Sequence, residues 1–157
     1  MKAIAQFFLI FSVAVLAACS TNPSPEMTPM EIRSLQTREF ETSKQIAFPS
    51  VITVLQDLGY SISQADIDTG FISAESASDS DEASKFWLGV SSVTQTKATA
   101  YVEEIGSFTK VRINFVTTTN KSYGWGQTDR EDTPILNAES YQYAFERIEN
   151  AIFVRSP

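Results

Sequence analysis

The sequence predicts an α+β fold in which two amphipathic helices pack on one face of an antiparallel sheet. Two segments, 41–59 and 138–154, carry apolar residues at helical spacing. Between them, several short segments alternate apolar and polar residues and are joined by turn residues. Strands joined by tight turns pair antiparallel, and helices can cover one face of such a sheet.

The first helix is predicted to end at Gly59, which can adopt the left-handed conformation without a Cβ clash. Its start is open, because Thr42–Gln45 has the pattern of a capping box while Pro49 would then fall inside the helix. We expect the helix to begin or bend near Pro49. Its apolar stripe comprises Val51, Val54, Leu55 and Leu58.

Alternation and turn chemistry predict the strands. One strand is expected over 35–41, and a strand–turn–strand unit over 59–76 has its turn at Asp68–Gly70. Two further strands, 96–104 and 110–118, each place three apolar residues on one face and are expected to form a hairpin.

The polar segments between these elements are predicted to be loops. They cover residues 76–85 and 120–134, and the second contains two glycines and a proline. Asn137 then caps a closing helix over 138–154. The apolar positions of that helix are Tyr141, Ala144, Phe145, Ile148, Ala151 and Ile152.

The N-terminus has the plan of a signal peptide. Lys2 precedes an apolar run from Ala3 to Leu16, which is too short for a membrane-spanning helix of about 20 residues. The following Leu16-Ala17-Ala18-Cys19 resembles the lipobox of bacterial lipoproteins. That resemblance implies diacylglyceryl transfer to the Cys19 thiol, cleavage before Cys19, and a membrane anchor of two or three acyl chains.

The predicted organisation has three parts: a lipoprotein signal peptide over 1–18, a lipidated flexible tether over 19–35, and an α+β domain over 36–157. The tether contains several prolines and has almost no hydrophobic periodicity. Ser20 stands where an aspartate retains enteric lipoproteins in the inner membrane, so the chain resembles the group sorted to the outer membrane. Another envelope membrane is the alternative.

A second resemblance covers residues 36–76. The stretches QTREFETSK and AFPSVITVLQDLGYSISQADIDTGFISAES resemble a motif of poorly characterised bacterial envelope lipoproteins. The element order is also similar to the helix-grip domains of BamC, the lipoprotein subunit of the outer-membrane β-barrel assembly machinery. These resemblances imply association with the cell envelope and a helix-grip-like arrangement, but no mechanism.

Composition excludes several function classes. The chain has 12 basic and 19 acidic residues, a formal net charge of −7 and no histidine. Nucleic-acid binding requires a basic face, and histidine is the commonest general base and metal ligand. Since lipidation would consume Cys19, no thiol nucleophile remains. We expect no enzymatic activity, no cofactor and no metal.

Two acidic groups are candidate sites. Glu103 and Glu104 are adjacent on a predicted strand, so they point to opposite faces and cannot act as a pair. Asp79, Asp81 and Glu82 lack the spacing and glycine of a calcium loop. Both groups are predicted to be solvated.

Tyr123 and Trp125 are the candidate partner-binding residues. They lie in a polar segment with glycines on either side of the tryptophan, and exposed aromatic residues are typical interface anchors. We expect them to fold back onto the sheet, with partner contact as the alternative. Phe86-Trp87-Leu88 is expected to be buried.

The sequence therefore predicts a non-enzymatic lipoprotein, anchored in the outer membrane and facing the periplasm. Its domain is expected to act as a scaffold or accessory subunit that binds other envelope proteins. The alternative is a carrier that binds a small molecule or lipid in a cavity between helices and sheet.

Overall fold

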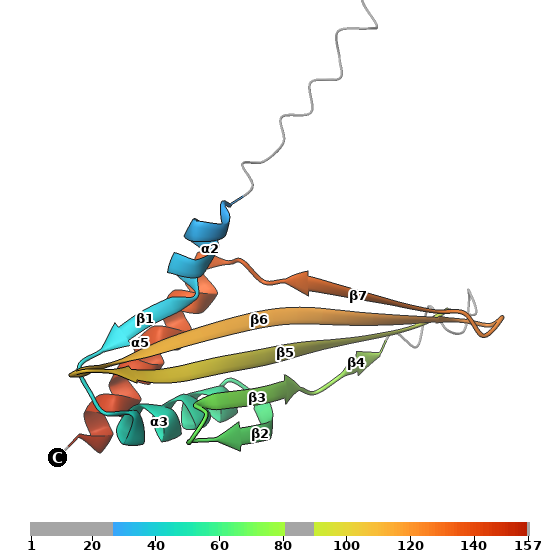
Figure 1. The fold of residues 1–157 in the computed structure, drawn as a ribbon. Helices are drawn as coiled ribbons and strands as arrows, with labels where there is room; N and C mark the ends of the chain where they lie inside the picture. The colour runs from blue at the N-terminus through green and yellow to red at the C-terminus, as the bar shows by residue number, and fades with distance from the viewer. Residues whose placement is uncertain (1–26, 81–89, 157) are drawn as a thin grey trace, which may run out of the picture.

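The computed structural model describes residues 27–80 and 90–156. Within these residues, three helices and seven strands form an α+β fold with one antiparallel sheet, which confirms the predicted fold class (Figure 1). The helices are α2 (Pro29–Leu35), α3 (Lys44–Asp57) and α5 (Ala138–Arg155). The strands are β1 (Thr37–Phe40), β2 (Tyr60–Asp66), β3 (Phe71–Ser76), β4 (Asp79–Ser80), β5 (Val90–Ile105), β6 (Phe108–Tyr123) and β7 (Thr128–Pro134).

The long β5–β6 hairpin is the centre of the sheet. The strand order is β1-β6-β5-β3-β2, and β4 and β7 pair with the far ends of β5 and β6. The hairpin turns at Gly106, which has φ +64° and is followed by a residue with negative φ. Glycine at the first central position is typical of the type II′ turns that match strand twist.

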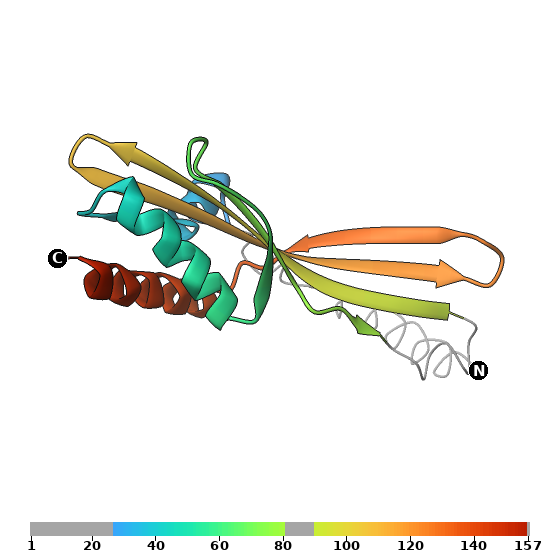
Figure 2. The same ribbon diagram turned by 90° about the horizontal axis from the view of Figure 1, so that it is seen from below.

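The core lies between the sheet and helices α3 and α5, which cover one face (Figures 1 and 2). Strand alternation directs Val102 and Ile113 toward this layer, as predicted, and both are fully buried. The predicted face of α5 supplies Tyr141, Phe145 and Ile148, which are also fully buried. The Phe115 amide donates to the Tyr141 hydroxyl at 3.2 Å, which satisfies that buried polar group.

Helix α3 begins earlier than predicted. It starts at Lys44 after Ser43 and contains Pro49 within it, so a start near Pro49 is wrong and the helix begins within the Thr42–Gln45 pattern instead. The Ser43 side chain makes no capping hydrogen bond; instead the Lys44 amide donates to Glu104 Oε2 on β5 at 2.8 Å. A distant carboxylate thus satisfies a free amide of the first turn. The helix ends at Asp57 with Leu58 as its C-cap, and Gly59 follows in the predicted left-handed conformation, with φ +88°.

The end of the predicted tether is helical. Thr28 and Glu31 form a reciprocal capping box, and Pro29 occupies the first turn of α2. The chain then passes directly into β1, so residues 29–35 are not part of a flexible tether. This helix buries none of its residues, which explains why hydrophobic periodicity did not predict it.

Two predicted loops contain strands. The segment 120–134 is not a loop, because β6 continues to Tyr123 and β7 returns along it from Thr128 to Pro134. Within 76–85, Asp79–Ser80 forms β4, and the residues from 81 onward lie outside the described part. Threonine has high strand propensity, and its run at 117–119 extends β6 without apolar alternation.

Candidate functional site

The sheet extends well beyond the helices. Figures 1 and 2 show α3 and α5 on one end of the sheet, while β4, β7 and the distal halves of β5 and β6 project past them. We call this projection the arm and define it as residues 79–80, 90–97 and 116–134. From Val116 to Tyr123, β6 alone extends about 25 Å at the rise of a strand.

The arm begins where the apolar face ends. On the helix-covered face, Phe115 is followed along β6 by Thr117 and Thr119, and their partners on β5 are Thr96 and Thr94. The hydroxyl oxygens of Thr94 and Thr119 lie 3.4 Å apart, within hydrogen-bonding range. Because these side chains are polar, this face of the arm can be exposed to water without a helix packed on it.

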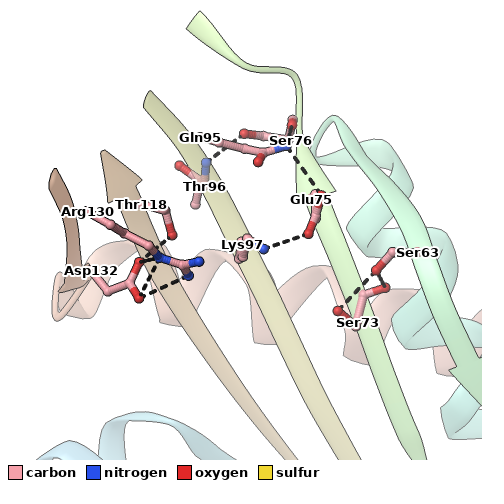
Figure 3. Close-up of polar contacts among 10 residues, drawn as sticks. All are labelled: Ser63, Ser73, Glu75, Ser76, Gln95, Thr96, Lys97, Thr118, Arg130 and Asp132. Carbon is pink, nitrogen blue, oxygen red and sulfur yellow. Dashed lines mark hydrogen bonds and ion pairs between the residues drawn. The ribbon is translucent and has the colours of Figure 1, made fainter. Parts of the chain in front are cut away.

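Polar contacts across the open face join the arm to β3. Lys97 Nζ lies 2.8 Å from Glu75 Oε1, and the Gln95 amide donates to the Ser76 carbonyl at 3.0 Å (Figure 3). The Thr96 amide donates to Ser76 Oγ at 2.9 Å. The base of the arm is therefore held by hydrogen bonds and one ion pair in addition to the strand ladder.

A second set of polar contacts holds β7 on β6. Thr118 Oγ1 donates to Asp132 Oδ1 at 2.7 Å, and Arg130 approaches the same carboxylate at 3.1 Å (Figure 3). The Thr118 hydroxyl, followed by the Arg130 guanidinium, lowers the pKa of Asp132 below its ordinary value. The outer strand thus has a charged surface, which is unfavourable for pairing with a further strand.

The tip of the arm presents an aromatic side chain to solvent. The Gly126 amide donates to the Tyr123 carbonyl at 3.0 Å, and the Tyr123 amide donates to the Gln127 carbonyl at 2.9 Å. Gly126 has φ +79°, which allows this short turn. Trp125 is 98% exposed, so the prediction that it folds back onto the sheet is wrong. Tyr123 beside it is also exposed.

The remaining predicted site residues divide into two groups. Cys19, Ser20, Asp81, Glu82 and Phe86-Trp87-Leu88 lie outside the described residues. Glu103 and Glu104 alternate on β5 and are both exposed, as predicted, and Glu104 in addition accepts from the first amide of α3.

Asp79 is exposed on β4, and residues 27–80 and 90–156 contain no cluster of three or more metal-ligating side chains. In the same residues, no helix has the length and apolar content needed to span a bilayer. No family model and no curated protein matches the chain.

Proposed function

We propose that this chain is a lipid-anchored protein of the outer membrane whose non-enzymatic periplasmic domain binds another envelope protein through the arm. The observation that carries the proposal is the position of Trp125, fully exposed at the end of a sheet that extends past its own core. A tryptophan in water gains nothing for the stability of the fold, whereas a tryptophan in an interface is a typical energetic centre.

The chemistry of the arm favours contact through its tip and faces. Asp129, Arg130, Glu131 and Asp132 place four charges in sequence on β7, which disfavours indefinite strand addition along that edge. The faces carry hydroxyl and amide groups that can form hydrogen bonds to a partner without a large apolar patch. Such a surface can stay soluble before the partner binds.

The proposed anchor is compatible with this role. Nine residues, Ser20–Thr28, separate Cys19 from α2 and can extend about 30 Å. Helix α2 follows at the base of the open face, so the tether leads into the half of the sheet that carries the helices (Figure 1). Lipid anchor and arm would then occupy different parts of the chain.

The filled interior favours a scaffold over a carrier. In a helix-grip-like carrier, the ligand would occupy the space between α3, α5 and the sheet. Here that space contains fully buried side chains such as Leu55, Tyr141 and Phe145. A ligand that displaced these side chains would open the close-packed core and strongly lower the stability of the fold.

Site-specific photocrosslinking tests the proposal. A photoreactive phenylalanine replaces Trp125 in the full chain, and intact cells are irradiated before the membranes are extracted. We expect a discrete protein adduct in the envelope fraction. The matched control carries the same group at Phe153 on α5, which is 81% exposed and distant from the arm. Absence of an adduct at position 125, or the same adduct from both positions, would contradict the proposal.

A further inference from the structure

A hollow of about 470 Å³ lies on the open face of the sheet, away from α3 and α5. Its floor comes from β3, β5 and β6, and its rim includes Ile32 of α2, Pro134 at the end of β7 and Leu136 just after it. The volume falls in the range of pockets that bind small organic ligands. The other lining residues are Gln36, Phe71, Thr99, Ala100, Tyr101, Arg112 and Asn114.

A buried glutamine orders the polar groups of this hollow. Gln36 is only 4% exposed, and its backbone carbonyl accepts from the Ile113 amide at 2.9 Å. Its side-chain oxygen accepts from Arg112 at 3.2 Å, while its side-chain nitrogen donates to Asn114 Oδ1 at 3.0 Å. Both ends of the glutamine amide are therefore engaged, and each fixes a neighbour that lines the hollow.

This arrangement leaves mainly donors facing the hollow. Because the Asn114 oxygen accepts from Gln36, the Asn114 amino group remains for a ligand. Arg112 uses one nitrogen on Gln36 and keeps its other N–H groups, and Tyr101, its direct cross-strand partner, adds a hydroxyl. Guanidinium, amino and hydroxyl groups can together donate hydrogen bonds to the two oxygens of a carboxylate.

Arg112 is one of the described basic residues that form no ion pair, although acidic residues predominate in the chain. The chain has 19 acidic and 12 basic residues, yet no carboxylate in the described residues lies within 4.0 Å of Arg112. By contrast, Lys97, Lys110 and Lys121 each form an ion pair on the same sheet. An exposed guanidinium that is held in place but not neutralised is suited to an external anion.

We infer that this hollow binds the free carboxylate end of a short peptide. Three strands at about 4.8 Å spacing form a floor wide enough for about three extended residues. Ile32, Phe71 and Leu136 can contact apolar side chains, and the donors can serve peptide carbonyls as well as the terminal carboxylate. The site lies on the open face of that half of the sheet whose other face carries the helices. Of the arm it includes only Pro134, at the base and far from the tip, so it goes beyond the proposed function.

Fluorescence anisotropy tests the inference with a defined probe. The full chain in detergent micelles is titrated against Ala-Ala-Leu that carries fluorescein at its amino end and a free carboxylate. The matched probe has the same sequence and label, but a carboxamide replaces its terminal carboxylate. We expect the carboxamide to bind about tenfold more weakly or worse, because charge-assisted hydrogen bonds to Arg112 are lost.

Variants locate the binding. Arg112→Gln should weaken the acid peptide to the level of the carboxamide, and Arg112→Lys should give an intermediate affinity since it retains charge without the planar fork. Asn114→Asp places a carboxylate beside Arg112 and should abolish binding. Arg155→Gln, on α5 at the other face, should leave the affinity within about twofold.

Three results would overturn the inference. They are equal affinity for the acid and the carboxamide, binding that is unchanged by Arg112→Gln, and displacement of the peptide by equimolar inorganic phosphate. The last result would identify a general anion site. Circular dichroism of each variant establishes that the sheet is intact, so loss of binding reports on the hollow and not on the fold.

Discussion

At the scale of single residues, the structure assigns roles to side chains that the sequence presents as ordinary surface groups. Glu104 lies next to Glu103 and both belong to an acidic pair at the end of a strand. Only Glu104 reaches the first turn of α3, where it accepts from the Lys44 amide at 2.8 Å. A helix N-terminus carries partial positive charge, so this carboxylate stabilises α3 through both the hydrogen bond and the dipole.

Glu104→Ala is therefore expected to lower the free energy of unfolding by about 1 kcal/mol, the usual value of an N-cap. Urea denaturation of the full chain measures the change. The matched control is Glu103→Ala, which removes the same charge from the opposite face and should change stability by less than about 0.5 kcal/mol. Equal effects of the two substitutions would show that Glu104 acts only through net charge.

Gly70 is required at the turn between β2 and β3. It has φ +78°, and a Cβ at this position would overlap the Val102 carbonyl oxygen. The same glycine accepts from the Val102 amide at 2.8 Å through its own carbonyl, so β5 cannot move away easily. Strain and steric overlap therefore act together.

We expect Gly70→Ala to destabilise the protein by about 3 kcal/mol or more, the sum of left-handed strain and overpacking. Gly59→Ala provides the comparison, because Gly59 has φ +88° but no atom within 4 Å of the added Cβ. That variant should cost only about 1–2 kcal/mol. Thermal or urea unfolding that gives the same loss for both alanines would contradict the role of the contact with Val102.

Several residue-scale predictions from sequence were correct because they depended on local chemistry. The left-handed Gly59 and the Asn137 cap need only their immediate neighbours, and both are confirmed. The start of α3 was wrong because its cap comes from Glu104, 60 residues away in the chain. The exposure of Trp125 was also missed, since only the tertiary structure shows that no core lies beside it.

At the scale of elements, the arm shows how far alternation can predict a sheet. Ala98, Ala100 and Val102 on β5 identify the strand that faces the core, and this part was predicted correctly. The alternation then stops, and the segment 116–123 contains three threonines, an asparagine and a serine. A sheet that is polar on both faces has no hydrophobic signal, so only strand propensity and the turn at Gly126 could have predicted β7.

The stability of β7 should depend on pH through Asp132. Its pKa is lowered because Thr118 donates to the carboxylate at 2.7 Å and Arg130 lies beside it. Because the pKa of Asp132 is lower in the folded state, its carboxylate contributes its full stabilisation at pH values above the unfolded-state pKa of about 3.9. This contribution is lost as the pH falls through the folded-state value. We therefore expect β7 to loosen selectively below about pH 4.

Amide hydrogen exchange across β7, expressed as protection factors at pH 6 and pH 3, measures this effect. Protection of residues 128–134 should fall at pH 3 relative to α5 in the same molecule. Asp132→Asn should give low protection at both pH values, because the charged acceptor is absent. Asp129→Asn is the control and should keep the pH dependence. A fall of equal size in α5 would indicate global acid unfolding instead.

At the scale of the whole molecule, the lengths of tether and arm determine where the tip can act. The nine residues before α2 reach about 30 Å, and the arm extends about 25 Å from the helix-covered half of the sheet. Under the proposed anchor at Cys19, a fully extended tether and the arm together would let Trp125 meet a partner at the bilayer surface or away from it. Such a reach is what the proposed role, contact between a membrane-anchored domain and a neighbouring component of the envelope, requires.

The anchor itself is the last prediction, and intact mass measures it directly. Protein extracted from membranes should have the mass of residues 19–157 plus diacylglyceryl and, where the amine is acylated, a third chain. Cys19→Ala should carry no lipid and retain residues 1–18, because lipid transfer to the thiol precedes cleavage in the lipoproteins that this terminus resembles. Trp125→Ala should be processed like the wild type, since the arm is far from residue 19 in the chain. A wild-type mass with an unmodified Cys19 would contradict the anchor, while the crosslinks from the arm would still report on the partner independently.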